Sequence, residues 1–231
     1  MLESEYYLEE LPAELYVKPK NNGDKPQIIV VSKLTPAKIY LEKNAKLNFI
    51  FVGTAGWQDL NVIEFHFVGE GAELEFMGLI VGNNDDQFKF ETLSKHVVPN
   101  TKARYQVKAA MFGAAVVDYK GNIVIEKKAQ ITDAYLSHDT LLLSEKSRAK
   151  TVPALEIEAD DVKCGHAATI GKVDEELMFY IRSRGIDTKL AEEMLINGFF
   201  AGLIDQIGDD DLKVKLYDEL RAHLPLKNDL F

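Results

Sequence analysis

The chain has 231 residues, of which 46% are hydrophobic, and this apolar content excludes an intrinsically disordered chain. Its net charge of −10 repels nucleic-acid phosphates and anionic lipid headgroups, so we expect neither nucleic acid nor a membrane as a partner. A single cysteine excludes an internal disulfide, as in proteins of a reducing compartment.

Residues 1–26 form the N-terminal lead-in of our interpretation. The first seven residues have neither a basic n-region nor an apolar h-region, which predicts no signal peptide. No apolar run reaches the ~20 residues of a membrane span. We therefore expect a soluble, cytoplasmic protein. The segment from Leu8 to Leu15 suits either a short helix or an extended lead-in.

Residues 27–172 are dominated by short runs in which apolar residues alternate with polar ones. This period of two is typical of β-strands, because successive side chains point to opposite faces. The runs are 27–31, 45–52, 61–68, 72–80, 87–93, 102–111, 121–125, 130–143 and 151–164. Hairpin signals are scarce, and Lys120-Gly121-Asn122 is the one that stands out as a turn. The pattern favours a parallel β-helix over a sandwich or barrel.

Residues 173–231 change to helical spacing. Asp174 and Asp187 are predicted N-caps of two helices that Gly185 and Gly208 end. Asp209 or Asp210 caps a third helix, in which leucine recurs every fourth residue at 212, 216, 220 and 224. The apolar stripes of these helices must pack on the β-helix, on each other or on another protein.

The segment 141–185 carries the most specific signal of the sequence. It reads LLLSEKSRAKTVPALEIEADDVKCGHAATIGKVDEELMFYIRSRG. This unbroken pattern resembles the C-terminal core of the SufB/SufD family of iron–sulfur cluster assembly scaffolds. The resemblance implies a right-handed parallel β-helix with a C-terminal α-helical tail, and a dimer formed through the end of the β-helix. It also implies a non-catalytic subunit with a SufC-like ABC ATPase docked on residues of about 174–207.

One strand of this segment separates the two branches of the family. Where the B-type branch carries a cysteine, this chain has Ile157, at the end of the strand that begins at Pro153. The departure indicates the SufD-type branch, whose dimer partner is a SufB-like paralogue or a second copy of the chain. The histidine that both branches share is His166.

Cys164 and His166 are the candidate metal ligands. Two residues apart on a strand, they share a face, with Cα atoms about 6.5–7 Å apart. Two ligands leave a metal site incomplete, and one thiol cannot supply the four cysteines that an iron–sulfur cluster usually takes. We therefore expect iron or an iron–sulfur cluster to be shared across a dimer interface. The alternative is structural: Cys164 belongs to the core and His166 is buried on a carbonyl.

The acids Glu156, Glu158 and Asp160 are expected on one strand face, most simply a solvated one. Glu156 is the third candidate cofactor ligand, because it adjoins the position of the missing cysteine. With Trp57, expected in a loop as a contact or packing residue, these acids also allow a carbohydrate-binding or carbohydrate-active β-helix. A purely structural β-solenoid is a third possibility. Nucleotide-binding loops are absent, and we expect no enzyme activity.

Overall fold

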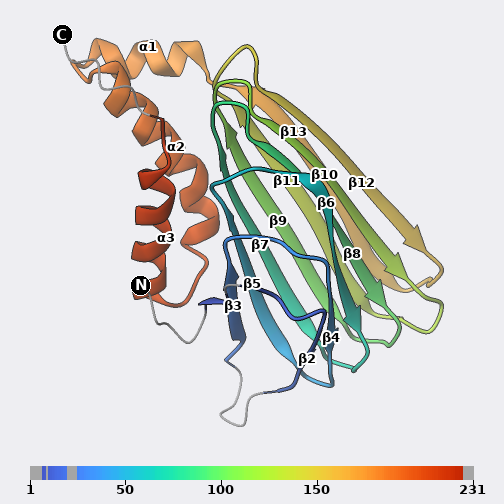
Figure 1. Cartoon of the computed structure of the whole chain (residues 1–231). Helices are drawn as coiled ribbons and strands as arrows, with labels where there is room; N and C mark the ends of the chain where they lie inside the picture. Colours follow the sequence, from blue (N-terminus) through green and yellow to red (C-terminus); the bar gives the residue numbers. More distant parts are fainter. Residues whose placement is uncertain (1–6, 9, 20–24, 226–231) are drawn as a thin grey trace.

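A computed structural model describes residues 7, 8, 10–19 and 25–225 of the chain. Within them the chain forms a parallel β-helix whose two sheets face each other, followed by three helices (Figure 1). The expected parallel β-helix with a C-terminal helical part is confirmed. Parts of the lead-in (1–6, 9 and 20–24) and the last six residues lie outside the described residues.

The strands of the two sheets alternate along the chain, as successive turns of a coil require. In the described residues the first sheet (sheet A) has the spatial order β1 (Tyr7–Leu8), β3 (Gln27–Val31), β5 (Lys46–Gly53), β7 (Glu73–Gly82), β9 (Lys102–Met111), β11 (Thr132–Leu142), β13 (Val162–Lys172). The second (sheet B) has the order β12 (Arg148–Ile157), β10 (Val116–Ile125), β8 (Gln87–His96), β6 (Trp57–Phe67), β4 (Ala37–Leu41), β2 (Glu14–Val17). Thus β1 and β2, from the lead-in, already belong to the sheets, and the Leu8–Leu15 segment contains no described helix.

Aromatic rings fill the space between the two sheets. Phe65 is fully buried and meets the rings of Phe49, Phe76 and Tyr105 edge-on at centroid distances of 5.5, 5.8 and 5.9 Å. Edge-to-face packing of this kind adds to the hydrophobic gain of burial. The alternation that predicted the strands therefore also predicted which side chains build the core.

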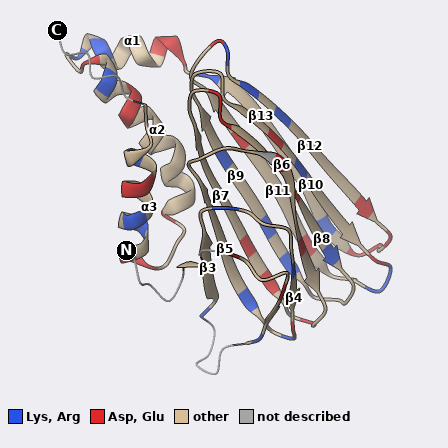
Figure 2. Cartoon of the chain, in the orientation of Figure 1, with Lys and Arg blue, Asp and Glu red and all other residues tan. Residues whose placement is uncertain are grey.

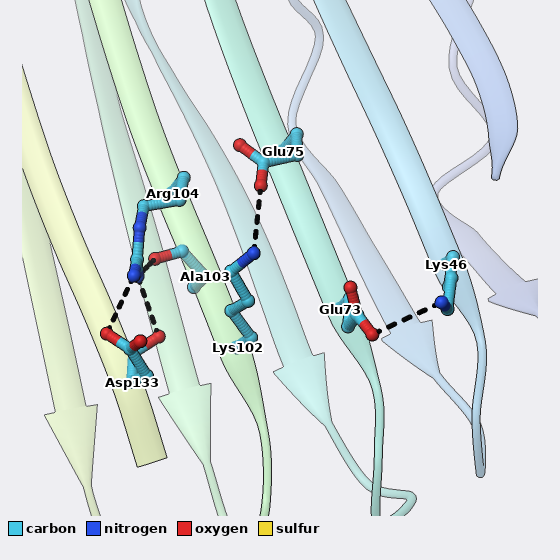
Figure 3. A network of polar contacts seen from close by, with 7 residues as sticks. All are labelled: Lys46, Glu73, Glu75, Lys102, Ala103, Arg104 and Asp133. Atoms are coloured by element: carbon cyan, nitrogen blue, oxygen red, sulfur yellow. Dashed lines mark hydrogen bonds and ion pairs between the residues drawn. The ribbon is translucent and has the colours of Figure 1, made fainter. Parts of the chain in front are cut away.

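The outer face of sheet A has two parts: one is covered by helices, and the other carries charged side chains. Helices α2 (Thr188–Ile204) and α3 (Asp210–Ala222) pack on an apolar area of this face. Elsewhere the face carries ion pairs between neighbouring strands, with nitrogen–oxygen distances of 3.4 Å for Lys46–Glu73, 3.7 Å for Lys102–Glu75 and 2.8 Å for Arg104–Asp133 (Figure 3). Charges of both signs are interspersed along the strands (Figure 2), as on a solvated surface.

The helix boundaries follow the predicted caps. Asp174 accepts hydrogen bonds from two backbone amides at the start of α1 (Glu175–Ser183), and Gly185 after it has a φ of 84°. Asp187 and Asp209 cap α2 and α3 in the same way. These are local signals, so the sequence was sufficient to find them.

Two local predictions were wrong. Lys120-Gly121-Asn122 is not a turn but the middle of β10, where Gly121 gives room to Leu136 and Tyr119 in the core. Trp57 is not in a loop: it begins β6, packs edge-on against Phe88 and donates its indole N–H to a backbone carbonyl at 3.1 Å. This half-buried tryptophan is a packing residue.

At one corner of the coil, a residue with a left-handed backbone conformation recurs in successive turns. Asn44, Gly71 and Asn100 occupy it with φ values of 56°, 76° and 55°. The next turn places Ile131 there, with a φ of 59° and a side chain that is 58% exposed. A β-branched residue is strained in this conformation, which asparagine and glycine tolerate.

Replacing Ile131 with Asn is expected to stabilise the protein by about 1 kcal/mol, because the strain is relieved and little buried surface is lost. Ile131→Val is the matched control, since valine is also β-branched and should leave stability nearly unchanged. Urea unfolding of the three proteins measures both effects. A loss of stability in the Asn variant would show that the exposed isoleucine contributes packing that outweighs its backbone strain.

Candidate functional site

The candidate site lies at the C-terminal end of the β-helix. Among the described residues β12 and β13 are the last strands of sheets B and A, so their outer edges have no neighbouring strand. Ile157 on β12 is 41% exposed, whereas Ile125, its register partner one turn earlier, is fully buried. On β13, Ile170 is 47% exposed and its partner Thr140 only 3%. Apolar side chains that face the coil interior therefore meet solvent here.

Cys164 and His166 both face this open interior. Their register partners on β11 are Ala134 and Leu136, each only 1% exposed and part of the core between the sheets. Paired residues of a parallel sheet point to the same side, so the two candidate ligands share the inner face, as predicted. Cys164 is half-buried and packs on the core, while His166 is exposed.

The thiol of Cys164 is not pre-ionised by its surroundings. Burial raises its pKa, a backbone hydrogen bond with Gly165 acts in the opposite direction, and the charge of Asp133 raises it further. A metal binds the thiolate, so binding here must release a proton. Cys164 is thus both a core residue and a possible ligand, the two roles that the sequence left open.

Glu156 lies apart from these two residues. Its register partner is Val124, and it alternates with Leu155, which packs on the core, so Glu156 points to the outer face of sheet B, where it is exposed. In the described part of the chain, no three histidine, cysteine or acidic side chains come together as a metal site. One chain therefore offers two donors, Cys164 and His166.

The predicted row of acids does not form. Strand β12 ends at Ile157, and Glu158, Asp160 and Asp161 belong to the corner before β13. The sequence run 151–164 was read as one strand because the corner contains neither glycine nor proline. Trp57 and Glu156 are also separated: Trp57 is level with Ala149 on β12, seven residues away, or about 23 Å along the strand. The geometry brings together no acid–aromatic pair for a carbohydrate.

A buried polar group lies one turn below the open end. His138 contacts the hydroxyl of Thr151 through Nδ1 and that of Thr140 through Nε2 at 3.2 Å. Burial lowers the pKa of His138 to about 4. The sequence showed His138 on the alternation of β11 but gave no signal for its partner on β12, because the coil turn between them sets that contact.

The helices present a second uncovered surface. None of the residues of α1 is buried, and Phe179 is 75% exposed. The other large apolar residues exposed on α1 and α2 are Leu177, Tyr180, Leu190 and Met194. We call these five residues the helical patch. Figure 1 shows α1 projecting beyond the sheets, whereas α2 and α3 lie along sheet A.

Comparisons with known proteins match most of this chain. Residues 30–199 match the family described as SUF system FeS cluster assembly, SufBD core domain. An iron–sulfur cluster assembly SufBD family protein of Mycobacterium leprae is 32% identical over 195 residues, which cover 80% of this chain and 50% of that protein. The iron–sulfur cluster assembly protein SufD of Escherichia coli is 32% identical over 157 residues, covering 68% of this chain and 37% of that protein.

The match extends beyond the segment that carried the resemblance. It includes most of the β-helix, all of α1 and the larger part of α2. The chain spans half or less of the length of these curated relatives. No helix within the described ranges has the length and hydropathy needed to cross a bilayer.

Proposed function

This chain belongs to the SufBD family, and from that membership we propose that it is a non-catalytic scaffold subunit of iron–sulfur cluster assembly. It pairs through the open end of its β-helix with a second copy or a SufB-like paralogue. Its helices bind a SufC-like ABC ATPase. The observation that carries the proposal is that two apolar surfaces of a folded family core, the coil end and the helical patch, are both uncovered.

The cluster is the cargo of this subunit. Cys164 and His166 fit it in chemistry, since thiolate and imidazole are iron ligands, but not in number. A second chain at the open end completes the set. Ile157, at the position of the cysteine of the B-type branch, removes a third donor and supports the SufD-type assignment.

His166→Ala is expected to lower the iron and sulfide content of the anaerobically reconstituted complex at least twofold, because it removes one of two donors that this chain supplies. Thr169→Ala is the matched control: Thr169 is exposed on the same strand but is paired with Asp139 and faces the outer side. Metal and sulfide analysis of the complexes gives the measurement. Unchanged contents in the His166 variant would exclude the histidine as a ligand.

A separate experiment tests the proposed binding of the ATPase. Co-purification of this chain with a SufC-like ABC ATPase should give a stable complex, and the apolar helical patch is the surface that we expect to be buried in it. If the ATPase binds equally well to a chain that lacks 174–231 but retains a folded β-helix, the helices are not its binding site.

A further inference from the structure

A charged side chain lies at the contact between α2 and sheet A, whose core is apolar. The sheet contributes residues such as Leu79 and Ala110, and α2 contributes Phe200 and Leu203, all of them buried. Lys108 is the register partner of Leu79 and lies two residues before Ala110 on the same face of β9. A lysine on a strand that α2 contacts is thus placed among apolar neighbours and is partly buried.

The side chain of Lys108 binds the backbone of α2. Its Nζ donates a hydrogen bond to the carbonyl oxygen of Phe199 and lies 4.9 Å from the centre of the Phe199 ring. A carbonyl oxygen has two lone pairs, so Phe199 can accept this bond in addition to a bond within the helix. The carbonyl and the ring together tie the ammonium group to one residue of α2.

Gly202 gives the ammonium group access to this carbonyl. A Cβ atom placed on Gly202 would lie 3.6 Å from Nζ of Lys108, so a side chain longer than that of alanine competes with the ammonium group for space. A Cβ atom on Gly198, one turn earlier, would have no neighbouring atom of the described chain within 4 Å. Of these two helix glycines, only Gly202 therefore adjoins Lys108.

Apolar packing does not by itself distinguish neighbouring turns of α2 at the centre of the contact. Consider a shift of one turn, about 5.4 Å, in which each residue takes the place of the residue four positions before it. Ile204 would then replace Phe200, and both side chains are apolar and buried. The same shift would bring Gln206 to the place of Gly202, where its side chain meets the ammonium group of Lys108. Lys108 therefore opposes this shift.

The sequence of α2 blocks the opposite shift. In that direction Glu192 would replace Ile196, which is 1% exposed, and its carboxylate would be buried in the apolar contact. Gly198 would take the place of Gly202, so Lys108 would not oppose this movement. Lys108 is thus needed against movement in one direction only.

The bonds of Lys108 suit positioning better than stabilisation. Burial lowers the pKa of Lys108, whereas the negative charge of Asp139, its register partner on β11, raises it. A partly desolvated ammonium group adds little net stability, because its desolvation offsets the gain from the bonds that it makes. A hydrogen bond depends on direction, in contrast to hydrophobic burial, and so distinguishes one arrangement from another.

We propose that Lys108 is a positioning residue that fixes α2 on sheet A, and through α2 the place of the helical patch. The inference rests on the proposed function, since the helical patch is the expected ATPase surface. Leu190 and Met194 of the patch belong to the same helix as Phe199, and α1 contacts α2. A shift of α2 by one turn would move the patch by about 5 Å relative to the open end of the β-helix.

Lys108→Met separates positioning from stability. Methionine is similar in length to lysine but uncharged, so the variant should unfold at the same urea concentration as the unsubstituted protein or at a higher one. Nitroxide labels in a Met194→Cys, Thr169→Cys, Cys164→Ala background report the position of α2 by electron–electron double resonance. The width of the distance distribution should at least double in Lys108→Met. Lys102→Met, on the same face of β9 but paired with an acid outside the helix contact, should leave the width unchanged.

Gly202→Leu tests the same contact from the side of the helix. Leucine there takes the space of the ammonium group, so the distance distribution should widen as in Lys108→Met. Gly198→Leu is the matched control, with the same substitution one turn away from the contact, and should keep the narrow distribution. An unchanged width in both Lys108→Met and Gly202→Leu overturns the inference. So does a Lys108→Met protein that loses stability while α2 keeps its position.

ATPase binding gives the functional measurement. In titration calorimetry Lys108→Met should bind a SufC-like ABC ATPase at least threefold more weakly than the unsubstituted chain, and Lys102→Met should bind it equally well. Unchanged affinity in a Lys108→Met protein with a widened distribution would overturn the link to the helical patch. If the unsubstituted chain binds no ATPase, that part of the proposed function is wrong, and the label distances alone decide whether Lys108 positions α2.

Discussion

Replacing Phe179 with Asp is expected to weaken binding of a SufC-like ABC ATPase by about 100-fold. Large aromatic side chains at the centre of an interface commonly contribute 2 kcal/mol or more, and about 2.7 kcal/mol corresponds to that factor. Phe179 is 75% exposed on a helix with no buried residue, so the substitution removes little packing within the chain. Titration calorimetry with the purified ATPase measures the loss.

The neighbours of Phe179 support this expectation. Tyr180 and Leu177 are exposed on the same helix, and Met194 lies on α2, which contacts α1. An uncovered apolar area of this extent on a folded protein commonly marks a protein interaction site. Unlike the apolar stripe of α3, which is buried through Leu216 and its neighbours, the side chains of the helical patch are exposed.

Val214→Asp is the matched control for Phe179→Asp. Val214 is 60% exposed on α3, outside the helical patch, so the same change in chemistry should leave ATPase affinity within about threefold. Both variants should melt within a few degrees of the unsubstituted protein. If both weaken binding equally, the effect is general electrostatic repulsion; if neither does, the helical patch is not the ATPase surface.

The sequence predicted well those elements that have a local signal, such as a helix cap, or a repeating one, such as the alternation of a strand. Helix caps such as Asp174 are read from a few consecutive residues. β3 was found with its observed bounds from its β-branched, apolar composition, and β9 from alternation. β4 was missed, although its five residues, Ala37–Leu41, alternate between buried and more exposed positions. Gly121 concealed the first half of β10, since a glycine that makes room in a core resembles a glycine in a turn.

The candidate site was predicted in part for the same reason. That Cys164 and His166 share a face follows from their spacing on one strand. That Glu156 faces away from them depends on the corner between β12 and β13, which no glycine or proline marks. The exposure of Ile157 is also a property of the coil end, and only the sheet order reveals that β12 is terminal.

Two buried histidines make the β-helix sensitive to acid. His96 lies between the hydroxyls of Ser94 and Thr101 at 2.9 and 2.8 Å. Thr132 donates its proton to a backbone carbonyl, so Thr101 donates to Thr132 and must accept from Nδ1 of His96. Nδ1 of His96 therefore carries a proton. Burial lowers its pKa to about 3, as it lowers that of His138 to about 4.

These lowered pKa values set the direction of the pH dependence. In the unfolded chain both histidines titrate at a pH of about 6.5. Below that pH the unfolded state therefore binds protons that the folded state does not yet bind. The stabilisation is complete above pH 6.5 and falls as the pH drops toward the folded values. Between pH 6.5 and pH 4.5, a span of about 2 pH units, each histidine loses about 2.7 kcal/mol of its stabilisation of the folded state, at about 1.36 kcal/mol per unit. Together they lower the free energy of unfolding by about 5 kcal/mol between pH 7 and pH 4.5.

His96→Asn separates this effect from the titration of surface acids. Asparagine keeps a donor for Thr101 but cannot be protonated, so the variant is less stable at pH 7 because of lost packing, yet its stability should fall about 2–3 kcal/mol less on going to pH 4.5. His223→Asn, which removes an exposed imidazole, is the control substitution. Urea unfolding at pH 7, 6, 5.5 and 4.5 gives the slopes. Parallel curves for all three proteins would mean that His96 is protonated within the folded coil, and the interior between the sheets would then be far more polar than its packing indicates.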